Sequence, residues 1–186
     1  YRMANVRAYD TGLTASFTLK RLKLTDRSIV QQITLGQINP LFKLLDGQTA
    51  TIPEQNQGNL SPVDIDASAF FETATLDSGF LDISISNNLP VKVKLVIFEL
   101  TNAGDNSQVA YDSFTNIPIG GKVTKRIDLK NKTVTKTLKG SIKQLSTEAS
   151  SGPVLIDASK GVDLELKVSR LHPRYAVAAF PTQNVI

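Results

Sequence analysis

The sequence predicts an all-β protein folded as an antiparallel β-sandwich, and three observations lead to this fold class. Apolar and polar residues alternate over residues 79–86 and again over 91–100, as in strands with one buried and one solvated face. At least seven such runs are separated by turn signals at intervals of about 8–12 residues, as in sandwiches. Strands do not alternate with helical patterns, which argues against a parallel α/β sheet.

Two strands are expected near the N-terminus. Residues 13–24 begin with apolar side chains on one face, and the alternation changes register at Lys20–Arg21. A β-bulge at that point would return the apolar side chains to the same face. Residues 28–35 form a second strand with a more ambiguous pattern.

A long connection is predicted over residues 36–62, which glycines and prolines interrupt repeatedly. Within it, Leu41–Leu45 is expected to form a short buried element, such as one helical turn, and residues 54–62 are expected to be mobile. The connection is also the candidate domain boundary. Residues 1–62 then belong to the same β unit or to a preceding one, and residues 63–186 form the sandwich domain.

From Val63 onward the alternation predicts a series of strands. A turn at residues 101–106 and a sharp break at Ile117–Gly121 separate some of them. Residues 132–149 fit a strand or a helix, because their apolar residues recur at near-helical spacing. The predicted strands cover residues 63–73, 75–86, 91–100, 108–114, 122–129, 154–158, 162–168 and 175–180.

The connection Asn87–Pro90 joins two of the clearest runs. It is short and rich in residues that favour turns. A short turn between two alternating runs is typical of a hairpin. We therefore expect residues 79–86 and 91–100 to pair as antiparallel neighbours.

The end of the run 91–100 carries more apolar residues than one buried face requires. Val96 and Phe98 have the parity of Lys92 and Lys94, so the second half of this strand is predicted to be apolar on both faces. An apolar surface of this kind is expected to be buried, either by another part of this chain or by another molecule.

Phe70 and Phe71 raise the same question, because adjacent residues of a strand place one ring on each face. For the strand 91–100, the protein's own segments 41–45 or 132–145 are one candidate cover, and a partner protein or lipid is the other. The candidate contacts for a partner or ligand are thus Val96, Phe98, Phe70 and Phe71.

The amino-acid composition limits the kinds of partner and of chemical site expected for this chain. The chain has 186 residues, 41% of them hydrophobic and 20% charged, which is ordinary for a globular protein. The net charge is +4, but the basic residues are scattered along strands, so no nucleic-acid partner is expected. There is no cysteine and one histidine, which leaves too few ligands for a zinc site, and no cofactor is predicted.

No catalytic residue is predicted, and the chain is not expected to be an enzyme. Any catalytic triad would have to use His172, which is expected in an exposed loop between strands. Asp64 and Asp66 have strand spacing and are expected to be solvated carboxylates on one face. Gly120–Gly121 before Lys122 predicts a tight turn rather than a phosphate-binding loop, because a strand follows instead of a helix.

Two resemblances add expectations about the class of protein. The segment Asn87–Pro90, the apolar strand after it, Val109–Tyr111 and the break Ile117–Lys122 together resemble the late-embryogenesis-abundant type-2 (LEA14-like, water-stress) sandwich domains. The likeness covers about residues 75–130 and implies an immunoglobulin-like sandwich.

The late part of the chain, from Val154–Asp157 through Ala178–Asn184, resembles secreted or outer-membrane-associated sandwich proteins of Bacteroidota-type bacteria. Such domains often serve as accessory subunits of envelope machines, for example around the type 9 secretion translocon. That resemblance implies an interaction module and no site residue.

The resulting hypothesis is a non-enzymatic protein of the cell envelope, periplasmic, in the outer membrane or secreted to the cell surface, that acts as an accessory or structural subunit through protein–protein contacts. Its partners would be other proteins of a larger assembly. Membrane association would come only through them or through a lipid anchor, and Tyr1 is consistent with a processed or partial chain. The alternative is a LEA14-like carrier of a lipid or small ligand.

Overall fold

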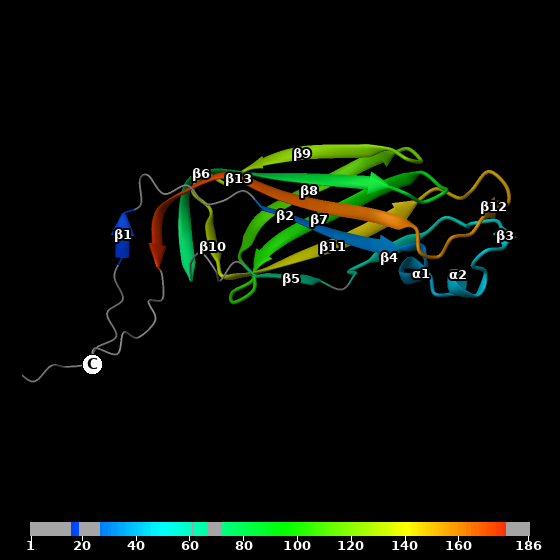
Figure 1. Cartoon of the computed structure of the whole chain (residues 1–186), viewed down its shortest axis with the longest axis horizontal. Coiled ribbons are helices and arrows are strands. Elements are labelled where there is room, and N and C mark those ends of the chain that lie inside the picture. The colour runs from blue at the N-terminus through cyan, green and yellow to red at the C-terminus, as the bar shows by residue number, and fades with distance from the viewer. Residues whose placement is uncertain (1–15, 19–26, 61, 67–71, 178–186) are drawn as a thin grey trace, which may run out of the picture.

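The computed structural model describes residues 16–18, 27–60, 62–66 and 72–177, and these form a two-layered antiparallel sandwich (Figure 1). The all-β prediction is confirmed. The first sheet has the order β1-β13-β6-β10, with β2 also on β13 and β9 also on β6. Its strands are β1 (Ser16–Thr18), β2 (Arg27–Thr34), β6 (Thr73–Asn87), β9 (Lys122–Asp128), β10 (Thr133–Thr135) and β13 (Gly161–Val177).

The second sheet has the order β4-β11-β7-β8, and β5 also pairs with β11. Two short helices and a small strand pair cover one end of the sandwich (Figure 1). The strands of the second sheet are β4 (Asn56–Gly58), β5 (Val63–Asp66), β7 (Val93–Asn102), β8 (Gln108–Ile117) and β11 (Thr137–Thr147). The end elements are α1 (Leu35–Ile38), α2 (Leu41–Leu44), β3 (Thr49–Ala50) and β12 (Val154–Leu155).

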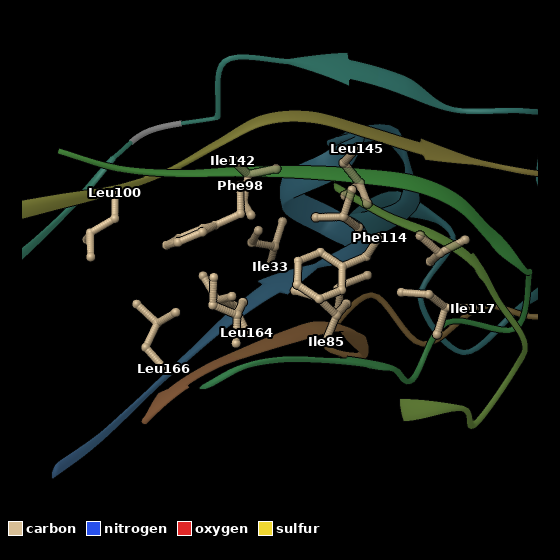
Figure 2. Close-up of a cluster of buried hydrophobic side chains, with 14 of the residues drawn as sticks. Ile33, Ile85, Phe98, Leu100, Phe114, Ile117, Ile142, Leu145, Leu164 and Leu166 are labelled. Carbon is tan, nitrogen blue, oxygen red and sulfur yellow. The ribbon is translucent and has the colours of Figure 1, made fainter. Parts of the chain in front are cut away.

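The core lies between the two sheets and is filled by aliphatic side chains and the rings of Phe98 and Phe114, and Phe42 of α2 belongs to the same cluster (Figure 2). Phe98 of β7 and Phe114 of β8 are fully buried, and they point from the second sheet toward Ile85 and Leu164 of the first. Burying a side chain of this size contributes roughly 1.5–3 kcal/mol. The core therefore supplies the main force that holds the two sheets together.

The described part of the first 62 residues belongs to this same sandwich. β2 pairs with β13 over eight residues, β3 pairs with β12, and β4 pairs with β11. The short helical turn expected at Leu41–Leu45 is present as α2, but the expectation that it is buried is correct only for Phe42, because Leu41 and Leu44 are exposed. The strand change expected at Lys20–Arg21 lies outside the described residues.

Residues 132–149 form strands and not a helix. β11 has neighbours on both sides, and its register against β7 shifts between Ile142 and Gln144. This bulge brings both Ile142 and Leu145 to the buried face, although they are three positions apart. A bulged strand thus produces the apolar spacing that resembled a helix.

The predicted hairpin of residues 79–86 with 91–100 is wrong. β6 belongs to the first sheet and β7 to the second, so the connection between them crosses from one layer to the other. Leu89 and Val91, in this connection, are buried between the layers. Burial of these apolar side chains stabilises the crossing, in place of the backbone hydrogen bonds that a hairpin of β6 and β7 would have formed.

A buried amide secures this crossing. Asn87 is fully buried, and its Nδ2 donates to the carbonyls of Val91, Ile117 and Pro118 at 2.9, 3.2 and 3.1 Å. Its Oδ1 accepts from the backbone N–H of Leu89 at 3.0 Å. One side chain therefore satisfies four backbone groups where the chain leaves the first sheet.

The expected positions of Val96 and Phe98 on the outer face of β7 are also corrected. Both side chains are fully buried in the core, and Leu95 and Ile97 are the half-exposed ones. The register against β11 passes from Val93 directly to Leu95, which leaves Lys94 as an extra residue. Beyond this bulge, the side chains that uninterrupted alternation would place inside lie outside, and those that it would place outside lie inside.

An ion pair links β6 and β9 and gives a testable pH effect. Arg126 Nε and Nη2 donate to the two carboxylate oxygens of Asp82 at 2.7 and 2.8 Å. These hydrogen bonds, and to a lesser extent the positive charge, hold the pKa of Asp82 below 3.8, although partial burial opposes the shift. Because the folded-state pKa is the lower one, the ion pair stabilises the fold above about pH 4 and this stabilisation is lost as the pH falls through the folded value.

We therefore expect Asp82→Asn to lower the free energy of unfolding at pH 7 by less than about 1 kcal/mol, because the guanidinium is exposed. Urea denaturation at pH 7 and pH 2.5 measures the difference. The gap between wild type and variant should close at the lower pH. An unchanged gap at both values would contradict this account.

Candidate functional site

The residues predicted as partner or ligand contacts do not form an exposed site in the described part of the chain. Val96 and Phe98 contribute to the core, where each has no exposed surface. Phe70 and Phe71 lie outside the described residues. Groups that a partner could reach lie instead on the surface and at the edges of the sheets.

His172 lies within a long irregular strand and not in a loop. β13 continues through it, with register shifts on both sides against β6. Its Nδ1 lies 3.1 Å from Ser78 Oγ and 2.9 Å from the carbonyl oxygen of Arg170. The neighbouring carboxylate, Asp77, pairs with Arg174 at 2.9 Å, and this hydrogen bond holds the pKa of Asp77 below its ordinary value. These contacts organise the bulged strand and do not form a nucleophile–base–carboxylate series.

The other motifs have the structures expected of them. Asp64 and Asp66 are both exposed on one face of β5. Gly120 has φ of 70° in the turn before β9, a conformation that favours glycine. Over the described ranges, no group of three or more potential ligands is placed to hold a metal ion. No helix of the described part is long and apolar enough to cross a bilayer.

Eight basic residues of the described surface form ion pairs with acidic neighbours. This pairing neutralises the strand faces instead of forming a basic patch. The pairs are Lys92–Glu148, Lys94–Glu54, Lys122–Glu165, Lys125–Asp112, Arg126–Asp82, Lys136–Glu72, Lys143–Glu99 and Arg174–Asp77.

The two sides of the sandwich differ in how their edge strands are protected. On one side, Lys125 of edge strand β9 projects toward β8 and donates to Asp112 Oδ1 at 2.7 Å and to the carbonyl of Ser113 at 2.6 Å. An inward-pointing charge of this kind prevents another strand from adding to the edge. The edge strand of the second sheet on this side is β8, and the same Lys125 contacts it at Asp112 and Ser113. The remaining described edges of the two sheets apart from β2, which are β1, β4, β5 and β10, offer at most four residues each.

β2, on the opposite side, has no such protection. It is eight residues long and pairs with β13, and no other described strand lies along its second side. Its sequence, Arg-Ser-Ile-Val-Gln-Gln-Ile-Thr, contains no proline and no charge after Arg27. Val30 is 67% exposed. A long, nearly uncharged edge strand is a surface on which another strand can pair.

The orientation of the β2 backbone follows from its hydrogen bonds. Leu35 N–H donates to the Lys160 carbonyl at 2.7 Å, which continues the β2–β13 register, so the odd-numbered residues bond to β13. Thr34 N–H instead donates away from β13, to Gln37 Oε1 at 2.8 Å. Bonded and outward positions alternate in antiparallel strands. The outward N–H and C=O groups of the edge are therefore those of Ser28, Val30 and Gln32.

An apolar seam runs beneath this edge, between the two sheets. A small hollow of about 10 Å³ separates β2 from β5 and is lined by residues of both sheets. A larger hollow of about 370 Å³ follows toward the helices. The small hollow is lined by Ile29, Gln31, Val63, Ile65, Gly140, Leu164 and Leu166. The large hollow is lined by Gln31, Gln32, Ile33, Gly36, Gln37, Pro40, Lys43 and Leu60.

Sequence reasoning missed this site, which we call the β2 edge: Arg27–Thr34 with the two hollows beside it. The strand itself was expected at residues 28–35. The available signal was the absence of charge from Ser28 to Thr34, in contrast to the lysines of 122–128. The sequence could not show that this strand lies at an edge, because edge position depends on which strands pair.

Comparisons with known proteins do not assign the chain to a family. No protein-family model matches it, and no curated protein is similar to it in sequence. A structure of Desmodium yellow mottle tymovirus aligns with 9% identity over 99% of this chain and 98% of that one, with a TM-score of 0.29.

A structure described as a carbohydrate-binding module of the β-sandwich superfamily aligns with 12% identity over 87% of this chain and 56% of that one, with a TM-score of 0.28. A structure of infectious bursal disease virus, Gt strain, aligns with 13% identity over 95% of this chain and 43% of that one, with a TM-score of 0.20. With scores this low, neither fold details nor function are transferred from these proteins.

Proposed function

We propose that this protein is a non-catalytic binding module that takes up an extended segment of another polypeptide as an added strand on the β2 edge. The observation that supports this proposal most is the contrast between the two sides of the sandwich. β9 carries an inward lysine, whereas β2 turns the backbone groups of three residues outward without any guarding charge. An accessory subunit that acts through protein–protein contacts fits this surface.

The expected binding energy is that of a peptide interaction of modest affinity that selects among sequences. Each backbone hydrogen bond formed to the edge contributes about 0.5–1.5 kcal/mol. Alternate side chains of the added strand would face the seam near Ile29 and Ile65, where burial of apolar area adds to the binding energy. The occupant expected is therefore a segment that alternates apolar and polar residues.

The cell-envelope location and the larger assembly implied by the resemblance remain predictions. The carrier hypothesis has less support, because it relied on Val96 and Phe98 to line a cavity, and both pack in the filled core.

The proposal predicts that Val30→Pro abolishes peptide binding and leaves the fold intact. Proline removes only the outward N–H of residue 30 and no hydrogen bond to β13, and edge strands accept proline at such positions. Random decapeptides displayed on phage are selected in parallel on wild type and on the variant. Wild type should enrich sequences with alternating apolar residues, and Val30→Pro should not.

Val30→Thr is the matched control, because it keeps the N–H and the β-branched shape. It should enrich the same sequences as wild type. Val30→Lys is a second blocking variant that introduces an edge charge and should also prevent enrichment. Thermal denaturation verifies that all variants are folded. No alternating sequences on wild type, or equal enrichment by folded Val30→Pro, would refute the proposal.

A further inference from the structure

A cationic group lies at the end of the β2 edge and has no acidic partner. In the part of the chain that the structure describes, six lysines form ion pairs and Lys43 is among those that do not. It lines the large hollow beside the last residues of β2. An unpaired ammonium next to a hollow of about 370 Å³ offers a site for a negatively charged group.

The position of Lys43 is determined by Gly36. A Cβ on residue 36 would lie 2.8 Å from Cγ of Lys43, closer than Cβ atoms approach other atoms in proteins, and 3.1 Å from its Cε, which is a tight contact. The lysine side chain therefore lies directly over the glycine, which is itself buried. This packing holds the aliphatic part of the lysine against α1 at the rim of the hollow.

The rest of the hollow is lined by groups that suit a carboxylate. Gln31, Gln32 and Gln37 also line it, and a glutamine carboxamide can donate to a carboxylate. The Oε1 atom of Gln37 is engaged by Thr34 N–H, which leaves the amide nitrogen as a donor. Ile33 and Leu60 add apolar surface for the methylene groups of an acidic side chain. Among the lining residues there is no acidic side chain that would repel an anion.

We infer that the large hollow binds an aspartate or glutamate side chain of the polypeptide segment that adds to β2, with Lys43 as its counter-ion. The inference rests on the proposed function of the β2 edge and specifies its partner. Since every strand pairing of the sandwich is antiparallel, we place the added strand antiparallel to β2. The hollow lies at the C-terminal end of β2, so the acidic residue belongs near the N-terminal end of the bound segment.

The test repeats the random decapeptide selection on wild type, Lys43→Gln and Lys130→Gln, the last being an exposed lysine outside the hollow. Wild type and Lys130→Gln should enrich alternating sequences with an acidic residue near the N-terminal end. Lys43→Gln should enrich alternating sequences without that residue. For one selected peptide, changing the acid to its amide should weaken binding to wild type about 5–10-fold at low salt and leave binding to Lys43→Gln unchanged.

Four outcomes would overturn one or both of the proposals. Alternating sequences without an acidic preference, or with a preference for a free C-terminal carboxylate, would overturn the inference and leave the binding edge intact. An acidic preference that persists in Lys43→Gln would also overturn it. No enrichment on wild type would refute the proposed function itself, and with it the inference. If wild type instead forms a dimer that Val30→Pro dissociates, a second copy occupies the edge and both proposals fail.

Discussion

Asn87→Ala should lower the free energy of unfolding by at least about 3 kcal/mol, which is a large part of the total for a domain of this size. The amide nitrogen satisfies three carbonyls and the amide oxygen one N–H, and the side chain has no exposed surface. Alanine removes all of these hydrogen bonds. The exposed Pro118 carbonyl still accepts from Gly121 N–H at 2.9 Å, but each buried backbone group left without a partner costs about 1–3 kcal/mol. Urea denaturation at pH 7 measures the change.

The adjacent residue provides the control. Asn88 is exposed, and its Nδ2 donates to Asp163 at 2.8 Å in contact with solvent. Asn88→Ala should change the free energy of unfolding by about 0.5 kcal/mol or less, because water replaces the lost partner. Similar losses for the two variants would show that the buried amide does not secure the crossing from β6 to β7.

Phe98→Ala should be the most destabilising single truncation in β7, by about 3–5 kcal/mol. The ring is fully buried between the sheets, and the surrounding side chains cannot collapse completely into the space it leaves (Figure 2). The same substitution at the neighbouring position, Ile97→Ala, should cost about 1 kcal/mol, since Ile97 is on the half-exposed face. Both values are measured by urea denaturation, with the same dependence of the unfolding free energy on urea concentration used for the two variants.

This pair of variants tests the bulge at Lys94 directly. Uninterrupted alternation from Val91 and Val93 places Ile97 inside and Phe98 outside. The structure places them the other way round, and the left-handed Asn116 of β8, with φ of 56°, lies across from the bulge. A larger loss for Ile97→Ala than for Phe98→Ala would contradict the register described for β7.

Several features of the fold could be predicted from local pattern. The strands from Val63 onward, the helical turn at α2 and the glycine turn before β9 all depend on the residues within each segment. Side-chain alternation and turn chemistry act over a few positions, so a single sequence contains the required information. The expectation that Asp64 and Asp66 share an exposed face was correct for the same reason.

The errors occurred where partners distant in sequence determine the result. The run Asn87–Pro90 has the chemistry of a turn, and only the competition between a hairpin ladder and burial of Leu89 between the sheets decides where β7 goes. β13 was expected as two strands around Pro173, yet it continues with shifted register because β6 pairs with both parts. Neither preference is visible within the segment itself.

The sequence by itself determined that this chain forms an antiparallel sandwich, because alternation and turn residues specify strands and the faces they bury. It did not determine which strands lie at the edges, since edge position results from pairing among all strands. The unguarded β2 edge and the unpaired Lys43 beside it became visible only in the tertiary structure. The physical reason is that backbone hydrogen-bonding groups are identical in every strand, and only assembly of the sheets decides which of them stay open.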